Sequence, residues 1–288
     1  MNSNHLSKAA PASAPLPTFE QFTAIRRFQG TLAFSPDASE VAYSVNTSGQ
    51  FNLWRQSSDG GYPHQVTLSS RQSVRELSWS PDGNTFAFTA DQDGDEFTKV
   101  YLVPSRGGQP VPVAVADQVQ YSLLGWSPNG QLIAYAGNDR EPANQDVIVW
   151  NVETGSEHRI MATGGLLFPA SWSPDSARML VIDAHSNTNV DIHVVEVETG
   201  ASRLLTPHEG EITYYPVGWT ADSSGFYFLS DEDREFTALG LFHLESGTRE
   251  WIETPDWDIE LAVTSQDGRR LVWAVNEDGY SRLFTRDL

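Results

Sequence analysis

The chain of 288 residues is 39% hydrophobic, carries a formal net charge of −20 and contains no cysteine. It can therefore bury a substantial core, but it can form no disulfide, thiolate metal site or cysteine nucleophile. Nucleic acid and anionic membrane surfaces are unfavourable partners, because phosphate binding needs concentrated positive charge and no Lys/Arg cluster interrupts the acidic background.

The N-terminal residues 1–17 are rich in Ser, Ala, Pro and Asn, which predicts a disordered tail. They lack the apolar core of a secretory signal, and no run of about 18 apolar residues follows, so we expect a cytoplasmic protein without a membrane span. Residues 18–29 are predicted to form a short helical segment. Its helix would cover Phe19 to Arg27, with Phe19, Phe22 and Ile25 on one face.

From residue 30 to residue 288 one motif recurs six times, as an aromatic or polar residue followed by Ser-Pro-Asp-Gly or a variant of it. The Ser or Thr of this motif returns every 45 to 47 residues, at positions 35, 80, 127, 173, 220 and 265. Self-similarity at this period is typical of propeller blades. The fourth residue of the motif is Asp37, Asp82, Asn129, Asp175, Asp222 and Asp267 in turn, for which we expect a turn-forming role.

Each unit carries four short β signals separated by turns. In the second unit a strand ending at Trp79 precedes the alternating run Phe86 to Thr89 and the apolar run Val100 to Val103, and a Gly107-Gly108 turn leads to Val111-Pro112-Val113. No helical pattern lies between the strands, which excludes a parallel α/β fold. The sequence predicts an all-β propeller of four-stranded antiparallel blades, with six repeats of about 46 residues.

The sixth unit has strand signals near residues 260–263, 271–275 and 282–285, and then the chain reaches Leu288. Its outer strand is therefore expected to be missing, and an exposed sheet edge is a liability that natural propellers close. We expect the six repeats to be part of a seven-bladed propeller, and the open edge to allow homo-oligomerisation.

Four tryptophans are the last residues of the innermost strands in successive units. They are expected to pack as wedges between neighbouring blades, where a large flat ring buries the most surface area. These are Trp79, Trp126, Trp172 and Trp219. The seven histidines show no repeated metal-ligand spacing, so we expect ordinary hydrogen-bonding roles for them, no metal site and no cofactor.

Two acidic loops between second and third strands are the candidate binding residues. Carboxylates around a glycine can hold calcium, but Asp-Gly is also ordinary turn chemistry, and the loops could instead receive a basic substrate end or a partner domain. The residues are Asp91, Asp93, Asp95 and Glu96 in the second unit, and Asp231, Asp233, Arg234 and Glu235 in the fifth.

The Ser-Pro-Asp-Gly turn, the strand after it, the Asp-rich loop and the Gly-Gly turn together resemble the TolB-like propeller repeat. That repeat also forms the N-terminal propeller of the prolyl oligopeptidase family of serine peptidases. The segment Phe19 to Arg27, followed by Ser35-Pro36-Asp37 and Val41-Ala42-Tyr43, resembles the start of an acylaminoacyl-peptidase-type chain. The resemblance covers residues 19–288.

This resemblance implies a catalytic α/β-hydrolase domain placed C-terminal to the propeller, with a Ser in a Gly-x-Ser-x-Gly elbow. The chain has no such elbow, and its nearest string, Gly125-Trp126-Ser127-Pro128-Asn129-Gly130, has the wrong spacing. No catalytic residue can therefore be assigned in this chain. The expected partners are the hydrolase domain of a parent peptidase and short peptides, whose access the propeller would gate.

Two other functions stay open on the sequence alone. The chain could be a stand-alone TolB-like scaffold that binds proteins or peptides on the face with the longer loops. It could also be a propeller enzyme with its own axial site, which would require carboxylates that converge on the axis.

Overall fold

The structure, a computed structural model, describes residue 16 and residues 18–288 of the chain. The expected disordered tail at residues 1–17 lies almost entirely outside this part. The first element is the helix α1 (Phe19–Thr23), which begins at Thr18 with a capping box: Gln21 N donates to Thr18 Oγ1 and Thr18 N donates to Gln21 Oε1. The helix is shorter than expected, because Arg26 and Arg27 already belong to the connection that leads into the first strand.

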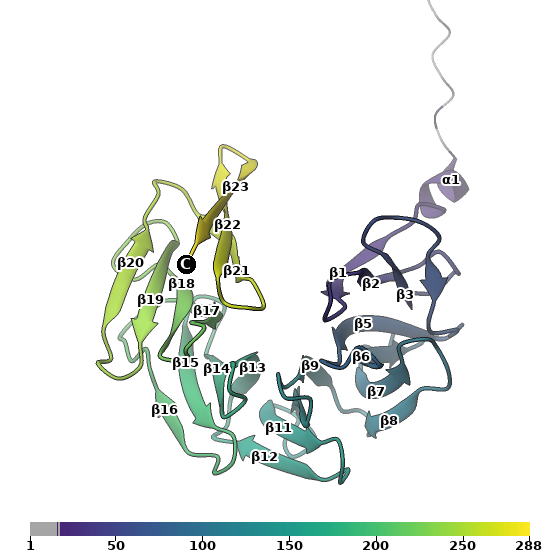
Figure 1. Cartoon of the computed structure of the whole chain (residues 1–288), viewed down its shortest axis with the longest axis horizontal. Helices are drawn as coiled ribbons and strands as arrows, with labels where there is room; N and C mark the ends of the chain where they lie inside the picture. Colours follow the sequence, from purple (N-terminus) through teal and green to yellow (C-terminus); the bar gives the residue numbers. More distant parts are fainter. Residues whose placement is uncertain (1–15, 17) are drawn as a thin grey trace, which may run out of the picture.

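In the described residues, twenty-three strands form six antiparallel sheets in which consecutive strands are neighbours, so the predicted all-β propeller of repeated blades is confirmed (Figure 1). The first three blades contain β1 (Phe28–Phe34), β2 (Glu40–Val45), β3 (Asn52–Ser57) and β4 (His64–Gln65); β5 (Gln72–Trp79), β6 (Thr85–Gln92), β7 (Lys99–Pro104) and β8 (Val111–Ala114); and β9 (Tyr121–Trp126), β10 (Leu132–Gly137), β11 (Asp146–Asn151) and β12 (Glu157–Met161).

Blades four and five also have four strands, whereas the sheet of blade six has three. These blades contain β13 (Leu166–Trp172), β14 (Arg178–Ala184), β15 (Val190–Glu196) and β16 (Ser202–Leu204); β17 (Tyr214–Trp219), β18 (Gly225–Ser230), β19 (Ala238–His243) and β20 (Arg249–Glu253); and β21 (Ile259–Thr264), β22 (Arg270–Glu277) and β23 (Tyr280–Asp287).

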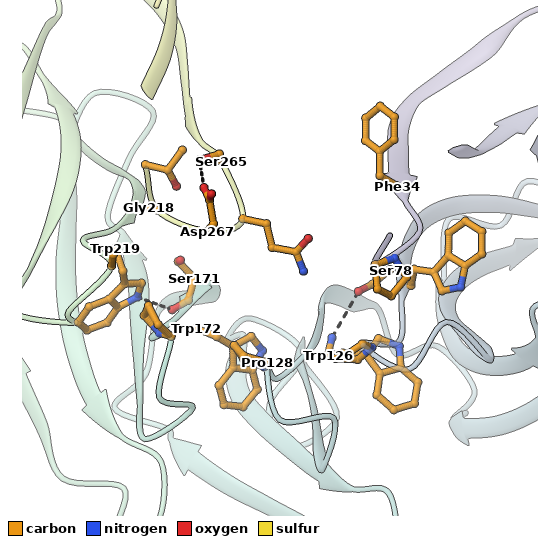
Figure 2. A pocket seen from close by; sticks show the side chains of 18 of the residues that line it. Phe34, Ser78, Trp126, Pro128, Ser171, Trp172, Gly218, Trp219, Ser265 and Asp267 are labelled. Atoms are coloured by element: carbon orange, nitrogen blue, oxygen red, sulfur yellow. Dashed lines mark hydrogen bonds between the residues drawn. The ribbon is translucent and has the colours of Figure 1, made fainter. Parts of the chain in front are cut away.

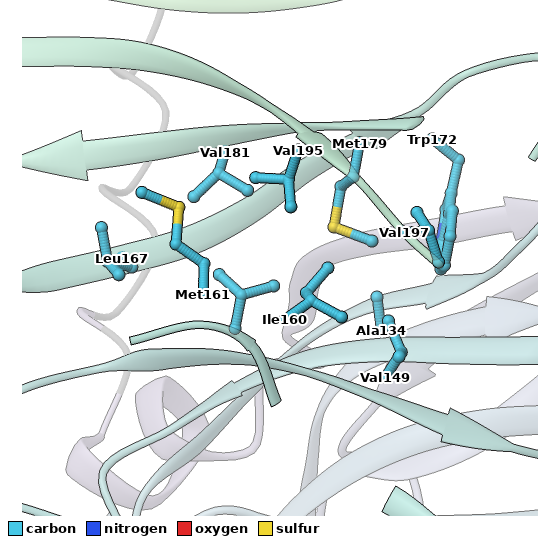
Figure 3. Close-up of a cluster of buried hydrophobic side chains, with 11 residues drawn as sticks. Ala134, Val149, Ile160, Met161, Leu167, Trp172, Met179, Val181, Val195 and Val197 are labelled. Carbon is cyan, nitrogen blue, oxygen red and sulfur yellow. The ribbon is translucent and has the colours of Figure 1, made fainter. Parts of the chain in front are cut away.

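The first strand of each blade is innermost, and these inner strands contact one another around the axis from β1 to β21. Hydrophobic side chains fill each of the five junctions between consecutive blades. Figure 3 shows the junction of blades three and four, where Ile160 and Met161 of β12 face Met179 and Val181 of β14. Burial of both faces explains why the second and third strands of the blades are apolar almost throughout.

The ring is open between its first and last blades (Figure 1). On β1, Ala33 packs against the core between blades one and two, while the alternate residues Phe28, Leu32 and Phe34 stay 64%, 61% and 57% exposed. On the other side of the opening, Leu261 of β21 and Leu283 of β23 are 56% and 75% exposed. The two blades that border the opening therefore each present an apolar face.

None of the described helices is long and apolar enough to cross a membrane.

Candidate functional site at the propeller axis

The turn between the first and second strands has the same internal hydrogen bonds in all six blades. In blade one, Ser35 Oγ donates to Asp37 Oδ1 at 2.6 Å and accepts from Glu40 N at 2.9 Å, while Ser39 N also donates to Asp37 Oδ1. These donors favour the ionised carboxylate, with the Ser35 hydroxyl foremost, and lower the pKa of Asp37 to about 2. The conserved geometry explains why Ser and Asp recur at fixed positions of the motif.

The turns of blades two and three rest on the turn of the preceding blade. The αL residue that closes the turn, Gly83 in blade two, has φ +74°, and a Cβ atom there would lie 3.6 Å from the ring of Pro36. Gly130 has the same relation to Pro81. The prolines and the turn glycines thus overlap around the axis and bring the six motifs, about 45 residues apart in sequence, to one face of the molecule.

These turns surround an axial pocket of about 490 Å³ to which all six blades contribute (Figure 2). Its walls come from inner-strand ends, from the prolines of the turns and from the last inner turn, which supplies Gln266 and Asp267. Of the tryptophans and aspartates at the repeated motif positions, the four tryptophans and Asp267 line the pocket, while Asp37, Asp82, Asp175 and Asp222 do not. The motif gives no sign of the contributions of Ser78 and Ser171, because these two residues precede it in their inner strands.

The four motif tryptophans lie between inner strands but differ in their hydrogen bonds. The indole N–H of Trp172 donates to Gly125 O and that of Trp219 donates to Ser171 O, both at 3.2 Å and both in the preceding blade. Trp79 donates instead to Gly83 O in its own turn, at 2.9 Å. The indole N–H of Trp126 has no acceptor among the described residues.

Close approach of neighbouring inner strands requires glycine at one position in particular. Gly125 has φ +115°, and a Cβ atom there would lie 2.2 Å from Ser78 Oγ of the preceding blade. Any larger residue would separate blades two and three and move the carbonyl that accepts from Trp172.

The axial pocket can hold an apolar or peptide-like group, but it carries no recognisable catalytic arrangement. Asp267 is the one carboxylate among the described lining residues, and it accepts hydrogen bonds from Ser265 Oγ at 2.6 Å and from Arg269 N at 3.1 Å. No histidine is among the described residues that line it, so the pocket hydroxyls have no imidazole base beside them.

The acidic loop of blade two lies on the opposite face from the turns, because it joins the other end of the second strand. Asp91 is buried and pairs with Arg75 Nη2 at 2.7 Å, and Asp93 forms an exposed ion pair with Arg71. Asp95 Oδ1 accepts from Gln92 N at 3.2 Å and from Phe97 N at 3.1 Å. Three of the four predicted binding residues are thus engaged within the loop or with a nearby arginine. The fourth is the exposed Glu96.

The acidic loop of blade five is organised in a similar way. Asp231 Oδ1 accepts from the backbone N–H and the hydroxyl of Thr213 at 2.8 and 3.0 Å. The guanidinium of Arg234 lies 4.4 Å from the centroid of the Trp251 ring, a cation–π distance. Asp233 and Glu235 remain exposed. The two acidic loops lie on opposite sides of the ring, so the structure does not bring them together (Figure 1).

Within the described part of the chain, no group of three or more His, Asp or Glu side chains is placed to hold a metal ion. Arg71 and Arg75 pair with the acidic loop of blade two, and the sequence gives no indication of this role. They lie in the inner strand or just before it, and only the pairing of β5 with β6 brings them beside Asp91 and Asp93.

The sequence of the chain is similar to those of known proteins. Residues 67–288 match the family model of the prolyl oligopeptidase N-terminal beta-propeller domain. Dipeptidyl aminopeptidase BIII of Pseudoxanthomonas mexicana is 24% identical over 226 residues, which are 77% of this chain and 32% of that protein.

Two solved structures share the fold. A chain from a study of two prolyl endopeptidases superposes with a TM-score of 0.73 at 16% identity, over 90% of this chain and 41% of that one. A putative TolB from Agrobacterium tumefaciens gives a TM-score of 0.59 at 22% identity, over 78% of this chain and 80% of that one. The matched part of the chain therefore spans about a third to two fifths of these two peptidases, and most of the TolB chain.

Proposed function

The chain belongs to the prolyl oligopeptidase family as its N-terminal β-propeller domain, and from this premise we propose that it controls peptide access to the catalytic domain of a larger serine peptidase. The propeller supplies no nucleophile and acts by steric selection. Short or unfolded peptides reach the catalytic domain, while folded proteins do not.

The observation that carries this proposal is the extent of the matches. The fold agrees with a prolyl endopeptidase over 90% of this chain but over only 41% of that chain. The study of that prolyl endopeptidase connects inter-domain dynamics with catalysis and specificity. We propose that here too the two roles belong to two domains: an α/β-hydrolase domain, which packs on the propeller, carries out catalysis, and the propeller controls access to it.

The open ring supports a further element of the proposal, a seventh blade. The faces on β1 and β21 that border the opening are apolar and exposed, as blade faces are before a neighbouring blade covers them. A seventh sheet would bury Phe28, Leu32 and Phe34 on one side and Leu261 on the other. The acylaminoacyl-peptidase type within the family also remains part of this proposal.

The axial pocket is the proposed point of selection. Its lining of proline and tryptophan is rigid, because the prolines fix their backbone and the tryptophans are held between inner strands. We propose that the exposed carboxylates Glu96, Asp233 and Glu235, on the opposite face, receive the hydrolase domain or a basic peptide end.

A second candidate function is a TolB-like scaffold for protein or peptide binding. The observation that favours it is that the chain covers 80% of the putative TolB chain, so a protein of this size can exist without a hydrolase domain.

The coding sequence around these residues and a chemical probe distinguish the two candidates. If the peptidase proposal is right, the coding sequence after residue 288 encodes further strands and then a Gly-x-Ser-x-Gly elbow. A fluorophosphonate probe, which reacts with the active serine of hydrolases, should then label the full-length protein but not the 288-residue chain. Loss of labelling on replacement of the elbow serine by alanine is the control. Labelling of the 288-residue chain itself, abolished by one Ser→Ala change, would contradict the proposal.

Selection at the axis is tested by narrowing the pocket in the full-length protein. Gln266→Trp should lower kcat/KM for peptide substrates, since it adds bulk to the pocket lining, whereas Asp59→Trp, on an exposed turn of blade one, should not. Equal kcat/KM values for the two variants would rule out admission through the axis.

A further inference from the structure

A second cavity lies between blades three and four, on the same face as the turns but away from the axis. It has a volume of about 560 Å³. Blade three contributes Leu132, Val149 and His158, and blade four contributes Val197 and Glu198. We call this cavity the 3/4 groove. Val149 and Val197 also belong to the apolar junction beneath it (Figure 3), and Leu132 packs against that junction, so the floor of the groove is hydrophobic.

The repeat allows a direct comparison with the next junction, between blades four and five. Arg178 is the first residue of β14, as Leu132 is of β10, and each donates its backbone N–H to the turn serine five residues earlier. Arg203 pairs with Val194 across β15 and β16, as His158 pairs with Val149 across β11 and β12. Two arginines in one junction thus correspond to a leucine and a histidine in the other.

These two arginines cross to blade five and bond to backbone carbonyls. Arg178 Nη2 donates to Ser223 O at 2.8 Å, and its guanidinium lies 5.2 Å from the centroid of the Trp219 ring. Arg203 Nη2 donates to Leu244 O at 3.2 Å. The cavity that remains there is only about 180 Å³. The chain itself therefore fills this junction with guanidinium groups.

The residues whose backbone carbonyls accept from the two arginines have equivalents in the junction of blades three and four. Ser176 and Ser223 both occupy the αL position of their turns, with φ +62° and +60°, and Val197 follows β15 as Leu244 follows β19. Ser176 and Val197 line the 3/4 groove, and none of the described residues that line it is an arginine in the place of Arg178 or Arg203. The carbonyls and the space are present, while the cation is not.

We propose that the 3/4 groove is a binding site for the arginine side chain of a peptide ligand. The three methylenes of the arginine lie on Leu132 and Val149, and the guanidinium donates to the carbonyls of Ser176 and Val197. The carboxylate of Glu198, on the rim, and the net charge of −20 favour a cation. Arginine is preferred over lysine, because its planar fork reaches two separated acceptors at once. The site is separate from the axial pocket and needs no hydrolase domain.

The first test is a titration of the 288-residue chain with N-acetyl-arginine amide, followed by the backbone amide shifts in NMR spectra. Saturable shifts should be confined to the residues of the 3/4 groove, and N-acetyl-lysine amide should bind at least about fivefold more weakly. Shifts that do not saturate, or equal binding of the two amides, would overturn the proposal, because they would indicate only nonspecific attraction to an acidic surface.

The second test lets the chain fill its own groove. Leu132→Arg combined with His158→Arg copies the arrangement of Arg178 and Arg203, and it should weaken binding of the arginine amide at least tenfold without lowering Tm. If the double variant does not fold, the single His158→Arg variant, changed at an exposed position, is used for the same binding measurement. The matched control is Thr85→Arg, the equivalent of Leu132 in blade two. Undiminished binding in the filled variants would overturn the proposal.

Discussion

The turn aspartates show how a single residue type serves the repeat. Asp222 Oδ1 accepts from Thr220 Oγ1 at 2.7 Å and from the backbone N–H and the hydroxyl of Ser224 at 3.0 and 2.8 Å. These hydrogen bonds, the Ser224 N–H foremost, lower the pKa of Asp222 to about 2. In blade three Asn129 takes the same place, with its side-chain oxygen accepting from Ser127 Oγ and Gln131 N. The turn therefore needs the oxygen acceptor, and the charge strengthens it.

This pKa predicts a specific acid sensitivity. Because the folded pKa lies below the ordinary value of 3.8, ionised Asp222 stabilises the fold fully above about pH 5, and this stabilisation is lost as the pH falls towards 2. In Asp222→Asn the loss in free energy of unfolding relative to wild type should be greatest at neutral pH and shrink between pH 5 and pH 2.5, as measured by urea unfolding. Asp59→Asn, at an exposed turn position, is the control. A difference that does not change with pH would contradict the assignment.

At the scale of elements, stability depends on the junctions between blades. Each blade is a thin sheet that cannot bury both faces alone, so the apolar clusters between sheets hold the ring together. Trp172 is a member of one such cluster, only 9% exposed, and it also crosses to Gly125 O of the preceding blade. Its ring thus combines apolar burial with a hydrogen bond between blades.

We predict that Trp172→Ala lowers the free energy of unfolding by roughly 3 to 5 kcal/mol, because it leaves a large cavity between blades three and four. Denaturant unfolding measures the change. Trp257→Ala should cost less than about 1 kcal/mol, since that ring is 43% exposed. A loss below about 1 kcal/mol at Trp172 would show that it is not a wedge between the blades.

At the scale of the whole molecule, the open ring leaves blade six supported on one side only. All eight residues of β23 are exposed, and within the described structure this strand is an edge of a three-stranded sheet. Strand edges with unpaired backbone groups tend to recruit another strand.

We therefore predict that the 288-residue chain either dimerises through this blade or exchanges its amide hydrogens rapidly across residues 271–288, while blades two to four stay protected. Analytical ultracentrifugation and hydrogen exchange measure the two outcomes. Extension of the chain by a further repeat should remove both. A strict monomer with blade six as protected as blade two would contradict the prediction and weaken the case for a seventh blade.

The sequence by itself determined the blade architecture, the strand order and the three strands that form the sheet of blade six. These features are local: the turn motif needs Ser and Asp at fixed positions, and alternating apolar residues between turns can form only short strands. The match to the peptidase propeller was visible for the same reason, since the repeat itself carries the resemblance.

Only the tertiary structure decided which residues meet. The ion pairs of Asp91 and Asp93 depend on strand register, and the axial pocket depends on the curvature that brings six distant turns together. The 3/4 groove depends on which side chains cross from one blade to the next. Leu132 and Arg178 hold equivalent positions in the sequence repeat, and the contacts across each junction determine that one leaves a cavity while the other fills it.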